Sequence, residues 1–216
     1  KNILTKFNFY KNKYKKIRKK LNILIENNII FVSDNLGYLY SYDYIKERVL
    51  WAKKLDVPFR SNMKIVRDKL IVSNQNNELI FFDKKTGNII KLIPTEEDII
   101  KNKFVNNLSM SDKDLIFLNS FGSLYSINFE SLDINWFINL NQSTDLSLSN
   151  LFLGTEIVNE KNKIIISSNQ KTYIIDSDSG SILSRYNFSA NIKPIIYNDY
   201  VFLVTKNNLI ICINLN

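Results

Sequence analysis

Few side chains in this chain of 216 residues are of the types that carry out catalysis. There is no histidine, which removes the commonest general base, the Ser-His-Asp arrangement and most zinc and haem sites. The single cysteine, Cys212, lies in the apolar run 210–213, where we expect a buried and unreactive thiol. With one cysteine, no disulfide can form within the chain. These residue types predict a protein that is not an enzyme and that binds no cofactor.

The densest acidic run is Glu96, Glu97 and Asp98, and three carboxylates in a row raise the question of a cation site. Adjacent carboxylates on a loop point in different directions, so we predict no metal site here. The run follows Pro94 and Thr95, and a Thr before acidic residues is typical of a helix N-cap. We therefore expect a solvated turn or the start of a helix.

Basic residues are concentrated at the beginning of the chain. Residues 1–20 contain nine of the 29 Lys and Arg residues and none of the 21 Asp and Glu residues, so the rest is close to neutral. The run 13–20 could contact phosphates while its tyrosine stacks on bases. The alternatives are a solvated strand and turn, whose lysines discourage edge-to-edge pairing, and contact with an anionic membrane surface. We expect the solvated strand and turn, and no nucleic-acid partner.

A seven-residue motif recurs along the chain, and the elements around it repeat with it. The motif at 37–43 returns at 77–83, 122–128, 170–176 and 208–214. Short β-branched runs bounded by Asn, Asp, Ser or Gly precede each copy, which predicts antiparallel hairpins. Residues 62–66 and 191–196 supply inner strands of the same units. A spacing of about 40 residues with four strands per unit predicts an all-β fold, a β-propeller of four-stranded antiparallel blades.

Tryptophans and turn residues occupy fixed positions in these repeats. Trp51 and Trp136 each lie 14 residues after the first residue of their motif, where an indole can wedge between adjacent blades as a structural contact. The second and fourth repeats have Lys91 and Ser184 there, so the wedge is missing from alternate blades. Turn residues also recur: we expect Asp43, Asp83 and Asp176 to cap turns, and Gly87 and Gly180 to adopt positive φ.

The repeats fill the chain, which we interpret as one propeller domain over residues 1–216. About five blades are present, near 21–55, 62–94, 105–140, 152–188 and 191–216, and the fifth ends after its third strand. Either a strand at 6–10 completes the fifth blade, or the chain is part of a ring of seven or eight blades, which we favour. The first residue is Lys and no signal-type segment follows, so we expect a processed chain or an excerpt.

The motif Gly-x-Leu-Tyr-x-x-Asp, followed by Lys-Thr-Gly and a Trp at fixed spacing, resembles the PQQ-type propeller repeat. Within that superfamily, residues 57–62, 77–82 and 119–125 resemble the BamB-like lipoproteins of the outer-membrane β-barrel assembly machinery. The resemblance implies a non-catalytic periplasmic scaffold, attached to the outer membrane through a lipid anchor upstream of this chain, that docks on the barrel-inserting subunit.

The same resemblance places Arg60, with its neighbours Val57 and Phe59, on an inter-blade loop used for docking. An Arg flanked by apolar residues is typical of an interface anchor. The alternative is a structural Arg that donates hydrogen bonds to loop carbonyls between blades.

Two other functions remain open from the sequence. The superfamily includes quinoprotein dehydrogenases, which bind PQQ and calcium and characteristically use a vicinal cysteine disulfide that one cysteine cannot form. An intracellular propeller that binds another protein is the second alternative. An upstream signal peptide ending in a lipidated cysteine would favour the envelope scaffold over the intracellular propeller.

Overall fold

A computed structural model describes residues 10–14, 16–96, 107–111, 113–141, 152–168 and 170–215. The chain divides into two compact units, unit 1 (residues 1–94) and unit 2 (residues 95–216). The described residues form antiparallel sheets, and the one helix among them is the short 3-10 helix η1 (Asn12–Tyr14). Glu97, Asp98 and the predicted strand at 6–10, except for Tyr10, lie outside the described residues.

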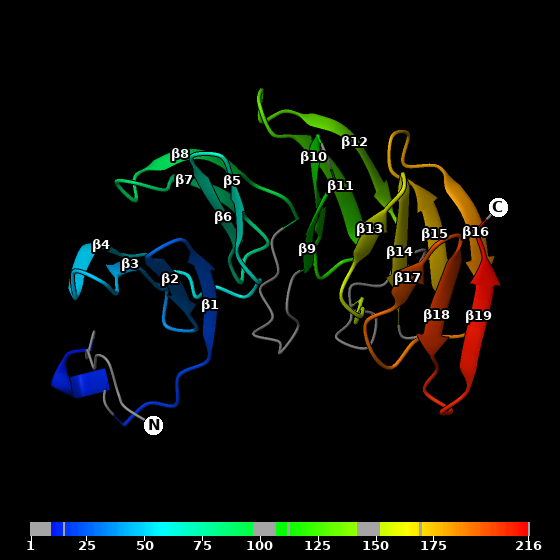
Figure 1. Ribbon diagram of the computed structural model, residues 1–216, viewed down its shortest axis with the longest axis horizontal. Coiled ribbons are helices and arrows are strands. Elements are labelled where there is room, and N and C mark those ends of the chain that lie inside the picture. Colours follow the sequence, from blue (N-terminus) through cyan, green and yellow to red (C-terminus); the bar gives the residue numbers. More distant parts are fainter. Residues whose placement is uncertain are drawn as a thin grey trace. The chain divides into compact units, whose positions relative to one another are not determined.

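Unit 1 contains two four-stranded sheets (Figure 1). The first has the order β1 (Leu21–Glu26), β2 (Ile29–Asp34), β3 (Tyr38–Asp43), β4 (Arg48–Lys54). The second has the order β5 (Lys64–Val66), β6 (Lys69–Ser73), β7 (Leu79–Asp83), β8 (Ile89–Ile93). Within each sheet, every strand pairs with its neighbour in the sequence, because each connection is short enough for a hairpin.

Unit 2 contains two further sheets of four strands and one of three. The first comprises β9 (Asn107–Met110), β10 (Asp114–Leu118), β11 (Ser123–Asn128) and β12 (Ile134–Asn139). The second comprises β13 (Val158–Glu160), β14 (Lys163–Ser167), β15 (Thr172–Asp176) and β16 (Ile182–Tyr186). The last comprises β17 (Ile195–Tyr197), β18 (Tyr200–Val204) and β19 (Ile210–Asn214). The predicted all-β architecture of antiparallel sheets is confirmed, and the last sheet has three strands among the described residues.

Sheets within each unit pack face to face through the alternate residues of their central strands. In unit 1, Phe31 and Leu39 of the first sheet join Leu70 and Phe82 of the second in one core. In unit 2, β14 serves two cores: Ile164 and Ile166 face the sheet β9–β12, whereas Ile165 faces the sheet β17–β19. Because side chains alternate across a strand, a central strand covered on both faces is apolar at every position.

The hairpin after each central motif holds a residue with positive φ at one fixed place. Glu47, Gly87, Leu132 and Gly180 each lie four residues after the last residue of the motif, with φ of 51°, 70°, 60° and 73°. Asp83 accepts hydrogen bonds from the backbone N–H of Lys85 and Thr86, and Asp43 and Asp176 accept equivalent bonds. The predicted capping role of these aspartates is confirmed.

The prediction that Cys212 is buried is wrong, because its side chain is exposed. Cys212 pairs with Phe202 across β18 and β19, on the face of the last sheet that points away from the core formed with β14 and β15. Tyr197 on the same sheet is 67% exposed. Nothing among the described residues of unit 2 covers this face, so an apolar run there does not imply burial.

Candidate protein-docking site

The loop 55–61, which we call the crossing loop, carries the chain from β4 to β5 and contains the three residues predicted to dock a partner. Val57 is half-buried, whereas Phe59 is 2% exposed and lies in the core of unit 1. The ring of Phe59 meets that of Phe82 edge-on at a centroid distance of 6.5 Å. The crossing loop is therefore anchored by Phe59, and the ring of Phe59 is not presented at the surface.

Arg60 is half-buried at the end of the crossing loop. Its backbone N–H donates to the carbonyl of Ser73 at 3.0 Å, and its Nη2 donates to Oε1 of Gln75 at 3.2 Å. Its Nε is buried and has no hydrogen-bond partner among the described residues. No carboxylate of the described residues forms an ion pair with it. The guanidinium is thus held in a defined place with part of its hydrogen-bonding capacity unused.

The loop between β16 and β17 repeats this geometry in unit 2. Ala190 forms a β-bridge with Thr205, as Phe59 does with Asn74 in unit 1. The backbone N–H of Lys206 donates to the carbonyl of Ser189 at 3.2 Å, which corresponds to the 2.8 Å bond from Gln75 to Pro58. Beside this loop lies an open pocket of about 370 Å³, with amide, hydroxyl, ammonium and apolar side chains in its lining. Sequence reasoning missed this pocket because no motif marks it.

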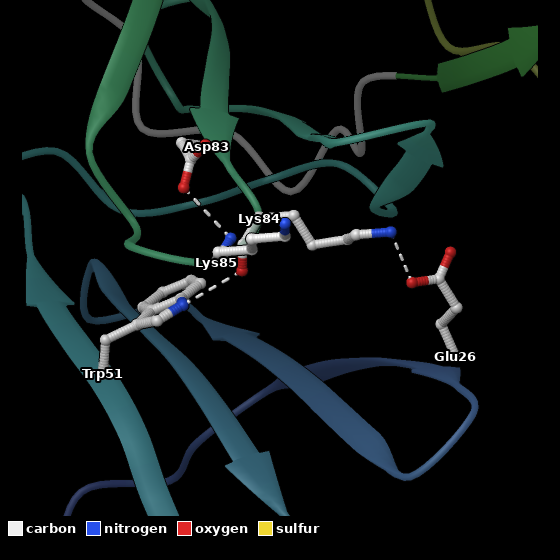
Figure 2. Close-up of polar contacts among 5 residues, drawn as sticks. All are labelled: Glu26, Trp51, Asp83, Lys84 and Lys85. Atoms are coloured by element: carbon white, nitrogen blue, oxygen red, sulfur yellow. Dashed lines mark hydrogen bonds and ion pairs between the residues drawn. The ribbon is translucent and has the colours of Figure 1, made fainter.

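Trp51, on β4, packs against the hairpin between β7 and β8 of the next sheet (Figure 2). Its Nε1 donates to the carbonyl of Lys84 at 3.1 Å. The Nζ of Lys84 forms an ion pair with Glu26 at 2.6 Å, so the same residue contacts the first sheet through its backbone and its side chain. These contacts join the two sheets of unit 1.

Trp136, on β12, makes the corresponding contact in unit 2. Its Nε1 donates to the carbonyl of Ser177 at 3.1 Å, in the hairpin between β15 and β16. Its indole lies against Gly180, as that of Trp51 lies against Gly87. Both tryptophans thus lie between one sheet and the next, at the same position of their repeats.

Glu96 is exposed, and its carboxylate accepts hydrogen bonds from Asn119 Nδ2, Ser123 Oγ and Tyr125 OH at 2.6, 2.7 and 2.8 Å. Glu97 and Asp98, where the predicted turn or helix would continue, lie outside the described residues. Burial alone would raise the pKa of the Glu96 carboxyl, but these hydrogen bonds stabilise the charged form and lower its pKa. Burial, together with the carboxylate of Glu96, raises the pKa of Tyr125. This cluster fastens the beginning of unit 2 to β11.

Among the described residues, no group of three or more His, Cys, Asp or Glu side chains could hold a metal ion. No helix in the described part of the chain is long and apolar enough to cross a membrane.

A family model described as "Outer membrane protein assembly factor BamB" matches residues 15–216. The chain belongs to the BamB family. Among solved structures, BamB from Moraxella catarrhalis superposes with a TM-score of 0.75 at 12% identity, and the match covers 91% of this chain and 60% of that one. The fold of this BamB-family chain is therefore that of a β-propeller, as predicted, and the chain spans 60% of the length of the Moraxella protein.

Two other solved structures share the fold of this BamB-family chain. The computationally designed Ika8 protein superposes with a TM-score of 0.71 at 10% identity, over 89% of this chain and 57% of the design. Quinohemoprotein alcohol dehydrogenase from Comamonas testosteroni does so with a TM-score of 0.66 at 10% identity, over 89% of this chain and 41% of the enzyme. At these identities the likeness concerns the fold alone. No curated protein sequence matches the chain.

Proposed function

We propose that this chain is a non-catalytic scaffold that binds a protein subunit engaged in outer-membrane β-barrel assembly. The proposal is supported by membership of the BamB family, whose description is that of an outer-membrane protein assembly factor. A periplasmic location at the outer membrane is part of the same proposal. A propeller serves such a role well, because its rigid sheets hold several loops in fixed positions.

The observation that carries the docking proposal is the state of Arg60. One of its Nη atoms is bonded to Gln75, while Nε is buried and has no hydrogen-bond partner among the described residues. Because Arg60 is half-buried, a carboxylate of a partner would meet the exposed part of its guanidinium rather than the buried Nε, in the charge-assisted pairing that makes Arg a frequent interface anchor. Val57 would add apolar contact with the partner. Phe59 would contribute indirectly, because its buried ring fixes the crossing loop.

The experiment is an affinity capture of the full-length protein from envelope extracts, with barrel-assembly subunits identified in the eluate. The Arg60→Glu variant replaces the donor with a group that repels a partner carboxylate. We expect it to weaken recovery of the barrel-inserting subunit by about 30-fold or more, as for other interface hot spots. Arg60→Lys keeps the positive charge but loses the planar guanidinium. Its recovery of the barrel-inserting subunit should lie between that of wild type and that of Arg60→Glu.

The matched control is Arg48→Glu, an exposed arginine of β4 in the same unit. It changes the net charge as much as Arg60→Glu does and should leave recovery of the barrel-inserting subunit unchanged. Thermal melting of all variants would verify that they fold. Equal recovery with Arg60→Glu and wild type would remove Arg60 from the interface. Stoichiometric PQQ binding with dye-linked alcohol oxidation would overturn the non-catalytic assignment.

A further inference from the structure

The basic residues near the beginning of the chain are attached to the first sheet rather than loose. We call residues 10–14 and 16–20 the basic segment; in Figure 1 it is the blue stretch that leads to β1. At one end, Tyr10 OH donates to Oδ2 of Asp34 at 2.6 Å. At the other end, the backbone N–H of Lys20 donates to Oδ1 of Asn35 at 2.7 Å. The segment therefore presents its side chains from a defined place on unit 1.

Tyrosine rings under the basic segment are packed against one another. Tyr38 stacks on Tyr40 at 5.8 Å between centroids, and the rings of Tyr10 and Tyr14 both meet Tyr38 edge-on at 5.8 Å. Ammonium groups cover these rings: Lys13 lies over Tyr14, Lys19 over Tyr10 and Lys54 over Tyr38, at 4.7, 4.5 and 5.3 Å. Binding of single-stranded nucleic acid needs ring faces on which bases can stack. Contacts within unit 1 already cover these faces, which disfavours nucleic acid as the partner.

The charges of the basic segment, in contrast, are available to a partner. Its exposed cations are Lys11, Lys13, Lys16, Arg18 and Lys20. The described part of the segment contains no acidic residue. Asp34, the carboxylate bonded to Tyr10, is buried and also accepts from the backbone N–H groups of Leu36 and Tyr38. The surface therefore carries an uncompensated positive charge that attracts anions.

Apolar side chains stand among these cations. Ile17 lies between Lys16 and Arg18 and is 44% exposed, and Leu21, directly after Lys20, is 49% exposed. Alternating cationic and apolar groups match the boundary between phospholipid headgroups and acyl chains, where cations meet phosphates and apolar groups enter the interface. We propose that the basic segment binds the anionic headgroups of a phospholipid surface, with Ile17 and Leu21 entering the interface. This contact is separate from the docking of a protein through Arg60.

The test is co-sedimentation of the full chain with vesicles of phosphatidylcholine, alone or with phosphatidylglycerol added. We expect binding only when phosphatidylglycerol is present, and weaker binding as salt is raised. The variant Lys11→Gln/Lys16→Gln/Arg18→Gln removes three side chains that form no hydrogen bond or ion pair among the described residues. Each exposed cation contributes about fivefold to binding at an anionic surface, so the variant should bind on the order of 100-fold more weakly. Ile17→Ser should weaken binding by about tenfold without any change of charge.

The control variant is Lys46→Gln/Lys85→Gln/Lys113→Gln, which changes the net charge equally at exposed lysines outside the basic segment. It should bind the vesicles like wild type. Equal binding of the first triple variant and wild type would overturn the proposal, as would equal binding to vesicles of phosphatidylcholine alone. Tighter binding of a single-stranded oligothymidylate than of phosphatidylglycerol vesicles would overturn it in favour of nucleic acid.

Discussion

Gly87 has no side chain at the place where the indole of Trp51 lies: a Cβ there would be 2.6 Å from Cδ2 and Cε3 of that ring. Gly180 stands in the same relation to Trp136, with a closest approach of 2.7 Å. The repeats thus alternate: a sheet that contributes the tryptophan is followed by a sheet that contributes the glycine. Glu47 and Leu132 hold the same hairpin position with positive φ, in the sheets that carry the tryptophans.

The variant Gly87→Ala should therefore destabilise unit 1 by about 2–4 kcal/mol. About 1 kcal/mol comes from placing a Cβ at a φ of 70°, and the rest from overlap with the indole. The measurement is urea unfolding of the wild type and the variant. In a Trp51→Ala background the same substitution should cost only the backbone share of about 1 kcal/mol. Equal costs in both backgrounds would show that the indole does not constrain Gly87.

The spacing of the repeats was enough to predict that the two tryptophans are structurally equivalent, and likewise the two glycines, because each occupies a fixed position in its repeat. What register does not give is which tryptophan faces which glycine, because the residues that meet come from different sheets and lie 36 residues apart in unit 1. The antiparallel hairpins were predictable for the same reason: their strands are neighbours in sequence and their turn chemistry is local.

Sequence reasoning is incomplete where distant contacts decide the environment of a residue. It did not predict the hydrogen bonds of Glu96, because the partners Asn119, Ser123 and Tyr125 come 23 to 29 residues later. Cys212 has a strand pattern identical to that of buried strands, and only the lack of a covering sheet among the described residues exposes it. Periodicity identifies a strand but does not say how many of its faces are covered.

The ion pair between Lys84 and Glu26 should contribute little, although it is short and lies beside Trp51 (Figure 2). Both side chains keep contact with solvent, at 19% and 36% exposure, so water screens the attraction. We expect a coupling energy below about 1 kcal/mol in a double-mutant cycle of Lys84→Gln and Glu26→Gln, measured by urea unfolding. A coupling energy above about 2 kcal/mol would mean that the pair is effectively buried.

Glu96→Gln should destabilise unit 2 by about 1 kcal/mol at neutral pH, because three donors lose a charged acceptor, while solvent at the exposed Glu96 side chain screens part of the effect. The pKa of Glu96 is lowered on folding from its ordinary value of 4.5, so its charge contributes stability above pH 4.5. That contribution is lost as the pH falls through the lower pKa of the folded state. The difference between wild type and variant should therefore shrink in acid.

Unfolding of unit 2 can be followed by the fluorescence of Trp136 in a Trp51→Phe background, since the chain has two tryptophans. Glu160→Gln serves as the control, because Glu160 is exposed at the end of β13 and should be neutral to substitution. A difference between wild type and Glu96→Gln that stays constant from neutral to acid pH would contradict the assigned charge state.

Cys212 should react with a thiol reagent in the native 216-residue chain without denaturant. Its side chain is exposed beside Phe202, on a face of β19 that the described residues of unit 2 leave open, so a reagent needs no unfolding to reach it. We expect one thiol per chain to react at a rate within about tenfold of that of the urea-unfolded protein, because exposure governs access. Cys212→Ser gives the blank. A thiol that reacts only after unfolding would show that something covers this face of the last sheet, and labelling before and after addition of a candidate partner would then identify what does.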